Sequence, residues 1–600
     1  MGEPMLRCVG FFCERLIAVE QGTAQARVSA NIVEYATSRP RVLRWLKSAA
    51  ILDGDWGTSI AYVLGIGFAL AGYSSMLHLS LMLGLTTLVA LNYVTICRLY
   101  PNGGGVYSSV YHRSRNLAVV GALLLSADYV VTMALSVLDA CHYIGLENPS
   151  GWAIAIILCI GVLNWYGPKH SGGFAFLISA LTLVTIITII AFSAPRALAY
   201  AAVQPPQDGL YSNWSFFVGI ILSISGIEAI SNMTGLMKDP ARDSRRAILS
   251  VLTKVVLATV FLGLAMHAIP GLTGHAEDMV RFLGEYYVGP WFGWVVAVTL
   301  GLLLVSAGNT ALNGLISTQF LMAVDQELPI ELRKLNKHGV PIIPLIIGTA
   351  IPVVVLIVVN DVLTLAQLYA IGVVGAVLIN VASTATDRSH NISPLVRWGM
   401  TVSAIVLFFI ELSIAVEKPK ATLFAAGILA IGLGARAIAK RRKALQPIFP
   451  ATVASAPPVR RRRIRKAPAT KYVVALKDRS ERLLKFAIEE ANARDALLVV
   501  LRIKEIAVGA LPQMLVMHSN GEEQRIAELC EAAKISYQII SIPSNEVGYT
   551  IVEQAALFGA DRVILGATHR TVLEKALKGN VVRSVSSLLP EEIQLIIFGG

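Results

Sequence analysis

Acidic side chains stand inside three stretches of the sequence that are otherwise apolar. Asp55 lies in GDWGTSIAY, Asp128 in SADYVVTMALS, and Glu228 in SGIEAISN. A carboxylate inside a membrane-spanning segment is costly unless it is paired or hydrated, so each of these acids is a functional-site hypothesis by default. Together with the hydroxyl groups on the same stretches they offer only oxygen donors, which suit a hard cation.

The spacing of the hydroxyl groups favours one common site. Thr132 and Ser136 follow Asp128 at intervals of four residues, which places all three on one face of a helix. Ser136 is explained equally well by a hydrogen bond to its own helix backbone. Glu228 is the candidate for proton coupling, because a carboxyl group beside a cation site can release a proton when the cation arrives. Asp53 and Asp139 lie closer to the ends of their stretches, so we expect them at interfaces rather than among the ligands.

The composition identifies the solvent that surrounds these acids. Of 600 residues, 55% are hydrophobic and 15% are charged, and the mean hydropathy is +0.63. Soluble proteins carry about 25% charged residues, so lipid surrounds most of this chain. About twelve stretches come near the ~20 apolar residues that cross a bilayer. They cover 47–71, 75–97, 117–143, 151–166, 173–195, 213–237, 247–269, 289–323, 342–360, 362–383, 397–415 and 420–438.

Charge in the loops predicts the orientation. Lys and Arg gather before the first stretch, after the last, and in every even-to-odd loop, whereas the opposite loops hold only Arg196, Arg281, Lys418 and Lys420. The positive-inside rule therefore places both termini in the cytoplasm. The net charge of +12 is then expected in cytoplasmic loops and tails, and nucleic acid is not an expected partner.

Glycines interrupt the first and sixth stretches beside their acids. Gly54 and Gly57 flank Asp55, and Gly226 precedes Glu228. The third and eighth stretches add polar insertions, SADYVVTMALS and SAGNTALNG, at corresponding places. This register fits two five-helix halves folded as an inverted repeat.

The whole sequence divides into four segments. Residues 1–46 are an N-terminal cytoplasmic segment, 47–440 the transmembrane domain, and 441–469 a basic linker rich in Pro, Ala and Arg, whose Arg460–Lys466 run either touches anionic headgroups or is simply solvated. From 470 to 600, short β-branched runs alternate with helical patterns, which indicates an α/β domain with a parallel sheet. The six cysteines are scattered and show no metal-binding spacing.

The motifs also resemble known families. GDWGTSIAY is similar to the GDxGTSxxY motif of KUP-type potassium permeases. The wider pattern, which includes YPNGGGVYSSV, SADYVVTMALS, SGIEAISN and LYAIGV, resembles KimA-type potassium–proton symporters of the amino acid–polyamine–organocation superfamily. The resemblance implies a LeuT-like fold with unwound first and sixth helices. It implies potassium ligands at Asp55, Tyr62, Asp128, Thr132, Ser136 and Ser225, with Glu228 at or beside this site.

Amino acid permeases of the same superfamily are the main alternative. They usually carry a Gly-Ser-Gly-type turn in the first span, whose free amides bind the substrate carboxylate. Here that turn carries Asp55, which would repel a carboxylate. A polyamine or another cationic amine suits the acids as well as potassium does.

The C-terminal domain resembles universal stress proteins. That family's nucleotide loop, G-x2-G-x9-G-[ST], corresponds here to Gly566, His569, Gly579 and Asn580, with the spacing kept and two identities changed. Such loops close backbone N–H groups on phosphate. In KimA-like symporters the domain is linked to homodimerisation and to inhibition by cyclic di-AMP, so cyclic di-AMP or ATP is the implied ligand, and a domain that only dimerises is the alternative.

These observations predict a multi-pass transporter of the bacterial cytoplasmic (inner) membrane that takes up potassium with protons and needs no cofactor. The alternative is an amino acid or polyamine permease of the same superfamily. A nucleotide sensor whose membrane part has lost transport is a third reading, which the three intact acids disfavour. We expect no enzyme, since no catalytic triad, metal cluster or Walker loop appears in the sequence.

Overall fold

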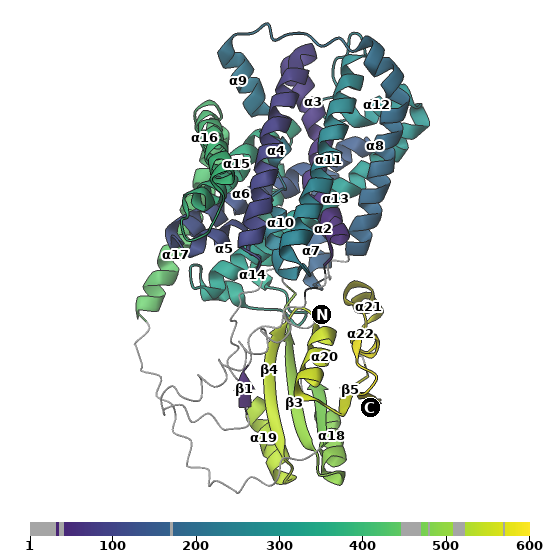
Figure 1. Ribbon diagram of the computed structural model, residues 1–600, viewed down its shortest axis with the longest axis vertical. Coiled ribbons are helices and arrows are strands. Elements are labelled where there is room, and N and C mark those ends of the chain that lie inside the picture. The colour runs from purple at the N-terminus through teal and green to yellow at the C-terminus, as the bar shows by residue number, and fades with distance from the viewer. Residues whose placement is uncertain are drawn as a thin grey trace.

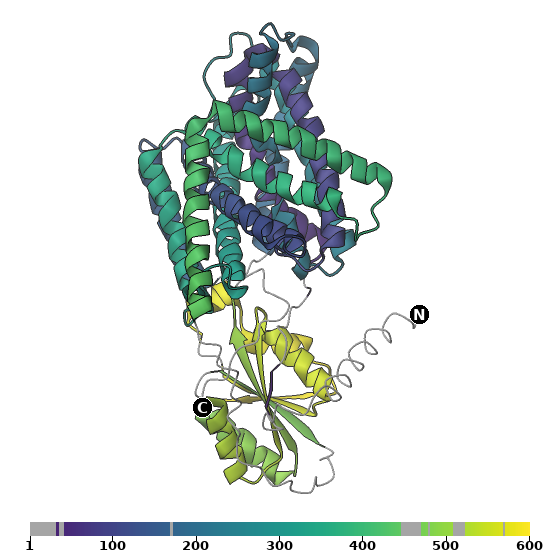
Figure 2. The same ribbon diagram turned by 90° about the vertical axis from the view of Figure 1, so that its left-hand side faces the viewer.

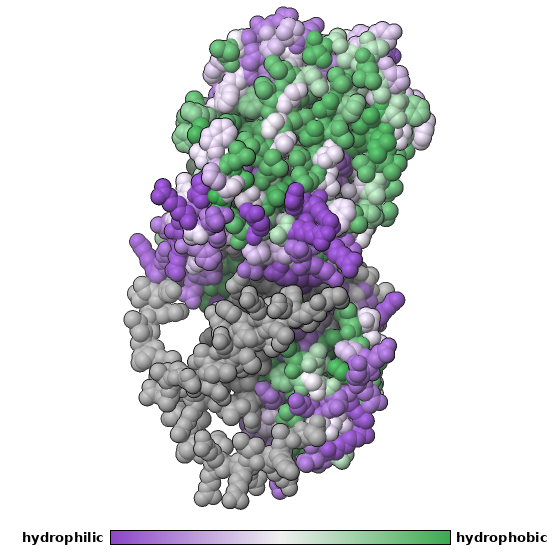
Figure 3. All heavy atoms as spheres, in the orientation of Figure 1, coloured by the Kyte–Doolittle hydropathy of each residue, from purple (hydrophilic) through white to green (hydrophobic). Residues whose placement is uncertain are grey.

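The computed structural model describes residues 32–34, 41, 43–167, 172–445, 470–477, 480–507, 522–567 and 570–599. They form a tall helical part and a smaller α/β tail below it (Figure 1; Figure 2). Hydrophobic side chains cover the middle of the visible face of the helical part, and hydrophilic ones gather at its upper end and along its boundary with the tail (Figure 3). This banding is what a bilayer around the helical part requires.

Each apolar stretch predicted from the sequence is helical. The first half comprises α2 (Trp45–Asp53), α3 (Ser59–Ala71), α4 (Ser75–Leu99), α5 (Gly105–Tyr111), α6 (Arg115–Ile144), α7 (Pro149–Trp165) and α8 (Gly172–Tyr200). The second comprises α9 (Leu210–Gly219), α10 (Ala229–Met233), α11 (Pro240–His267), α12 (Met279–Tyr287), α13 (Pro290–Val324), α14 (Ile342–Val358), α15 (Val362–Thr386), α16 (Pro394–Glu417) and α17 (Pro419–Leu445).

Among the described residues, eight helices are long and apolar enough to cross a membrane, or nine if the bent pair Leu210–Gly219 and Ile221–Leu236 counts as one span. One of the eight, Trp56–Leu99, contains both α3 and α4, which a short 3-10 turn at Gly72–Ser74 separates. Two shorter apolar helices, Pro149–Trp165 and Ile342–Val358, match the predicted stretches 151–166 and 342–360. These findings confirm a multi-pass helical membrane protein.

The first and sixth spans are interrupted where their glycines indicated. α2 ends at Asp53, a 3-10 turn covers Trp56–Thr58, and α3 continues the span. In the sixth span, Ser225 is extended and Gly226 has a φ of +84°, a left-handed conformation that favours glycine. Both breaks free backbone groups at the centre of the helical part.

The helix α6 forms the centre of this part. The Ser114 side chain caps its N-terminus by accepting from the Leu117 N–H, and nearly all of its residues from Ala118 to Cys141 are buried. The helices α13 and α15 pack along α6. By contrast, α8, α16 and α17 expose large apolar side chains such as Phe192, Phe408 and Leu423, as lipid-facing helices do.

The tail is a doubly wound α/β domain. Its strands are β2 (Lys471–Leu476), β3 (Leu497–Glu505), β4 (Tyr537–Ser544), β5 (Arg562–Gly566) and β6 (Gln594–Phe598), all parallel, in the order β4-β3-β2-β5-β6. One apolar cluster joins the sheet to α18 (Glu481–Ala493) and α19 (Glu522–Ala532). The other joins it to α20 (Val547–Phe558) and α22 (Val581–Leu588), while α21 (Val572–Lys578) precedes α22. The predicted parallel α/β domain is confirmed.

An additional strand of the tail sheet comes from the N-terminal segment of the chain. Residues Ile32–Glu34 form β1, which pairs in parallel with Ile539–Ser541 at the edge of the tail sheet. From the sequence, residues 1–46 were expected to be a cytoplasmic segment, and this strand was not predicted. The linker run Arg460–Lys466 lies outside the described residues.

Candidate functional site

The break in the first span places Asp55 inside the helical part. Asp55 precedes the 3-10 turn, and its carbonyl accepts a hydrogen bond from the Thr58 hydroxyl. Its side chain is buried, and Oδ2 has no hydrogen-bond partner. Buried polar atoms normally find a partner, so an unpartnered carboxylate oxygen is a feature to explain.

The second acid comes from the central helix. Asp128 on α6 is buried, and the Thr132 hydroxyl one turn later lies 2.9 Å from its carbonyl oxygen and 3.2 Å from its Oδ1. Tyr369 on α15 is also buried and interacts electrostatically with Asp128. The Asp128 Oδ2 atom has no partner.

The break in the sixth span supplies the third acid. Glu228 follows Gly226 and precedes α10, is buried, and has an unpartnered Oε2. A Cβ built on Gly226 would lie only 2.5 Å from the Trp56 backbone N, so the two broken spans approach backbone to backbone. The Trp56 indole N–H donates to the Ser223 carbonyl at 3.1 Å, which fixes this approach.

The structure brings the three acids together. Asp128 and Glu228 each interact electrostatically with Asp55, and Glu228 also with Asp128. Three ionised carboxylates in one buried cluster repel each other, because charges interact strongly where water is excluded. The cluster therefore needs bound cations or protons to be neutral, and its three unpartnered oxygens are available to them.

The other predicted ligands are also buried, but they lie at different positions relative to the three acids. Tyr62 is buried and lies within electrostatic range of Asp55 and Asp128. Ser225 is buried at the sixth-span break, directly before Gly226. Ser136 is buried on the Asp128 face of α6, two turns further along. Tyr369 was not predicted from the sequence, although LYAIGV contains it, because a tyrosine in an apolar helix gives no local signal of what it faces.

Asp53 and Asp139, the two acids expected at interfaces, are both buried within the protein. Asp139 is fully buried with neither oxygen partnered. Asp53 is 1% exposed and forms an ion pair with Lys254 on α11 at 2.6 Å. A helix end lies at an interface only if its span is continuous, whereas α2 ends at the break in mid-span.

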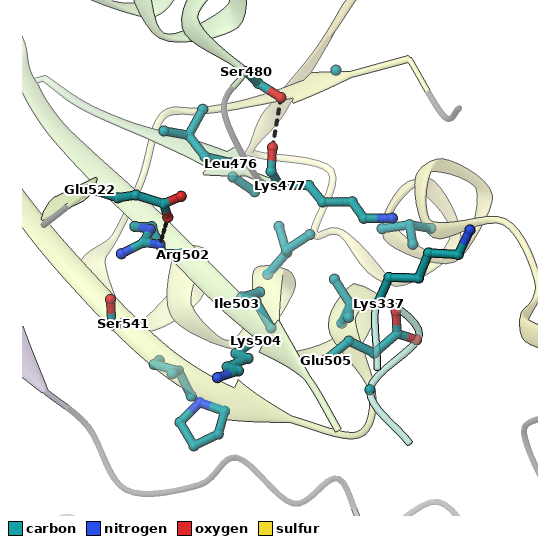
Figure 4. A pocket seen from close by; sticks show the side chains of 18 of the residues that line it. Lys337, Leu476, Lys477, Ser480, Arg502, Ile503, Lys504, Glu505, Glu522 and Ser541 are labelled. Carbon is teal, nitrogen blue, oxygen red and sulfur yellow. Dashed lines mark hydrogen bonds and ion pairs between the residues drawn. The ribbon is translucent and has the colours of Figure 1, made fainter. Parts of the chain in front are cut away.

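A second candidate site lies where the tail meets the helical part. A cavity of ≈ 1450 Å³ is lined by the carboxyl ends of β2, β3, β4 and β5 and by residues 330–339, which follow α13. Figure 4 shows Lys337 of the helical part and Lys477 of the tail at the same rim. The cavity lies outside the carboxyl ends of the strands, where open α/β sheets bind ligands. Basic side chains outnumber acidic ones in its lining: Arg333, Lys334, Lys337, Lys477, Arg482, Lys485, Arg502, Lys504 and Arg570.

The predicted nucleotide residues lie near this cavity without all lining it. Gly566 at the end of β5 lines it. His569 lies outside the described residues. Gly579 has a φ of +73° after α21, and its carbonyl accepts from Arg570. Asn580 caps α22, since its Oδ1 accepts from the Val582 and Arg583 N–H groups, and its role toward phosphate stays a prediction.

Residues 336–341 dock directly on the tail. The Ala507 N–H donates to the Gly339 carbonyl at 2.9 Å, and the Lys578 ammonium donates to the His338 carbonyl at 2.6 Å. His338 Nδ1 lies 2.9 Å from Glu574 Oε1. Burial lowers the pKa of His338, and a backbone hydrogen bond from Thr571 lowers that of Glu574.

Within the described residues, no group of three or more His, Cys, Asp or Glu side chains is placed to hold a metal ion. The three acids in the helical part are thus not arranged like the ligands of a divalent metal centre.

Comparison with known proteins identifies both parts of the chain. Residues 43–431 match the family model described as amino acid permease, and residues 471–590 match that of the universal stress protein family. An uncharacterized transporter of Legionella pneumophila is 25% identical over 46% of this chain and 64% of its own length. A probable threonine/serine transporter of Bacillus subtilis is 26% identical over 34% of this chain and 48% of its own length.

A D-serine/D-alanine/glycine transporter of Escherichia coli K12 is 24% identical over 36% of this chain and 50% of its own length. The matches thus span between about half and two thirds of these relatives. The Bacillus subtilis and Escherichia coli relatives are named for amino acid substrates, so the comparisons do not support the expected membership among KimA-type potassium symporters. The chain belongs to the amino acid permease family and carries a C-terminal universal stress protein family domain.

Proposed function

We propose that this permease is a secondary transporter for a small positively charged substrate, coupled to protons. The observation that carries the proposal is the buried cluster of Asp55, Asp128 and Glu228, each with one unpartnered oxygen. A substrate with a net positive charge neutralises such a cluster, whereas an anion or a zwitterion without net charge does not. Glu228, at the sixth-span break, is the proposed site of proton exchange.

The first candidate substrate is a cationic amine, either a polyamine or an amino acid with a basic side chain. The family model and the named relatives favour an amine-bearing substrate over a bare ion. The three carboxylates favour extra positive charge over the neutral amino acids named for those relatives. An ammonium group can donate to the unpartnered oxygens, as charge-assisted hydrogen bonds require.

The second candidate is potassium, which the close approach of the two broken spans favours. The Gly226 backbone lies against that of Trp56 and Asp55, which leaves little width between the breaks for an organic substrate. The donors proposed for the ion, Tyr62, Thr132 and Ser225 with the acids, present only oxygen, and oxygen ligands replace the hydration shell of a hard cation.

Uptake by proteoliposomes tests both candidates in one system. Purified protein is reconstituted with a pH-sensitive dye inside, and labelled putrescine, spermidine, arginine, serine and rubidium (as the potassium probe) are added separately under an inward proton gradient. We expect one cationic substrate to enter and to acidify the lumen, and Asp55→Asn and Glu228→Gln to abolish that uptake. Asp208→Asn is the control, because Asp208 is an exposed acid outside the site.

Each outcome decides between the candidates. Amine uptake without rubidium uptake supports the first, and rubidium uptake alone supports the second. Uptake of serine but of no cation would contradict the proposal, because the cluster would then tolerate a zwitterion. Growth of a strain without potassium uptake systems provides an independent check of the potassium candidate.

For the tail we propose regulation by an anionic nucleotide, cyclic di-AMP or ATP, in the basic cavity between tail and helical part. We also propose that the tail forms a homodimer, that both termini are cytoplasmic, and that the membrane is the bacterial inner membrane. Titration of full-length protein with each nucleotide tests the ligand, with Lys477→Ala expected to weaken binding. Binding that is unchanged in Lys477→Ala and Lys337→Ala would contradict the assignment to this cavity.

A further inference from the structure

An ion pair is buried in the helical part next to the break in the first span. Lys254 Nζ lies 2.8 Å from Asp53 Oδ1 and 2.6 Å from Oδ2, and the Ser179 hydroxyl donates to Oδ2 at 2.6 Å. The side chains of Lys254 and Asp53 are 9% and 2% exposed. Both carboxylate oxygens of Asp53 therefore have hydrogen-bond partners, whereas Oδ2 of Asp55 has none.

The pair lies deep in the apolar part of the protein. Lys254 stands on α11, the 28-residue helix Pro240–His267, eight residues after Arg246, so roughly 12 Å of helix separates it from the charged N-terminal turns. Its ammonium group turns to Asp53 inside the protein rather than to the membrane surface. Buried ion pairs contribute little net stability against an apolar replacement, and their best-attested use is to specify one arrangement or to switch between two.

The pair connects three helices that pack against one another. Asp53 is the last residue of α2, Ser179 lies on α8 and Lys254 on α11. The α2 segment has nine residues, and its other end is held by backbone hydrogen bonds from Leu43 N–H to the Leu236 carbonyl and from Lys238 N–H to the Leu43 carbonyl. Two polar anchors thus hold α2, one at each end.

The carboxylate of Asp53 also closes over the break. A Cβ built on Gly57 would lie 2.1 Å from Asp53 Oδ1, so only glycine at 57 lets the carboxylate fold over the turn that carries Asp55. α2 lies on the tail side of that turn (Figure 1). With Asp55, Asp128 and Glu228 all buried, the cluster is closed to that side in this structure.

We infer that the Asp53–Lys254 pair is the lock that holds α2 closed over the acid cluster, and that it breaks when the cluster opens to the tail side. This inference rests on the proposed transport function, because a protein that does not transport has no need to open. Lys254 is a positioning residue in this account and does not contact the substrate.

Cysteine accessibility tests the lock without knowledge of the substrate. The six native cysteines are replaced by alanine, and Ala50→Cys, a buried position on α2, reports on opening. Labelling by a small polar maleimide is compared in the parent, in Lys254→Met, and in the double variant Asp53→Asn/Lys254→Met. The double variant leaves no unpaired buried charge, so it is expected to fold even if the single variant does not.

We expect Ala50→Cys to be labelled roughly tenfold faster or more in the double variant than in the parent, a typical size for coupling between conformational states. The exchanged pair Asp53→Lys/Lys254→Asp should restore slow labelling in part. Exposed Lys47→Cys verifies that the reagent reaches α2. The neutral pair Glu327→Gln/Arg436→Met, which removes another buried ion pair remote from α2, should leave labelling unchanged.

Equal labelling in the parent and in a folded double variant would overturn the inference, since the pair would then be static. Faster labelling in the Glu327/Arg436 control as well would also overturn it, because the effect would be general loosening. Faster labelling in a protein that transports none of the cations tested leaves the lock in place and contradicts only the proposed substrate.

Discussion

Replacing Gly226 by alanine tests whether the two broken spans meet as closely as the structure shows. Gly226 has a φ of +84°, and an added Cβ would lie 2.5 Å from Trp56 N and 2.8 Å from the Asp55 carbonyl carbon. The left-handed backbone costs a non-glycine residue about 1–2 kcal/mol. The contacts are with backbone, which cannot rotate away, and overpacking of this kind costs roughly 1–3 kcal/mol more.

Gly226→Ala should therefore destabilise the occluded arrangement by about 2–5 kcal/mol. Since 1.4 kcal/mol is a factor of about ten, uptake should fall at least tenfold and the melting temperature of the purified protein should drop. Melting is followed by intrinsic fluorescence and uptake by the proteoliposome assay, so the structural effect is measured even if no substrate has been found.

Gly84→Ala provides the matched control. Gly84 lies in α4, is exposed, and has no atom within 4 Å of an added Cβ. Alanine is about 0.8–1.0 kcal/mol more favourable than glycine inside a helix, so this variant should keep full uptake and melt no earlier than the parent. If Gly226→Ala behaves like Gly84→Ala in both measurements, the spans do not meet at this point, and the argument for a narrow cation site fails with it.

Three further predictions follow from individual groups. Glu228→Gln should keep exchange of labelled substrate across the membrane but lose accumulation driven by a proton gradient; accumulation at the wild-type level would exclude Glu228 as the coupling group. The pKa values of His338 and Glu574 are lower in the folded protein than in the unfolded chain. Both groups therefore stabilise docking of the tail at a pH above their pKa values in the unfolded chain. This stabilisation is lost as the pH falls through their pKa values in the folded protein. The protection of the amides at 336–341, measured as the ratio of the intrinsic to the observed exchange rate at each pH, should therefore fall between about pH 7 and pH 5, and His338→Gln should remove most of that fall. Burial raises the pKa of Cys530 to about 12, so a variant with this cysteine alone should resist iodoacetamide at pH 8 until it is denatured, and rapid labelling of the native protein would contradict its buried position.

The sequence alone determined the elements of this protein. Hydropathy and loop charge are local properties of the sequence. The twelve apolar stretches could be predicted because a bilayer requires spans of a certain length. The parallel α/β tail could be predicted because strand and helix patterns alternate along it. The acids Asp55, Asp128 and Glu228 could be singled out for the same reason, since a charge in an apolar stretch is visible without any partner. The glycines of the first and sixth spans likewise indicated where the helices break.

Only the tertiary structure decided which groups meet. Asp53 and Lys254 are 201 residues apart, and nothing near either residue indicates that α2 and α11 pack together. The same holds for Tyr369 beside Asp128 and for β1 beside β4, because such contacts depend on the packing of whole elements. A local sequence pattern indicates which chemistry a residue can perform, and the fold determines which residues it contacts.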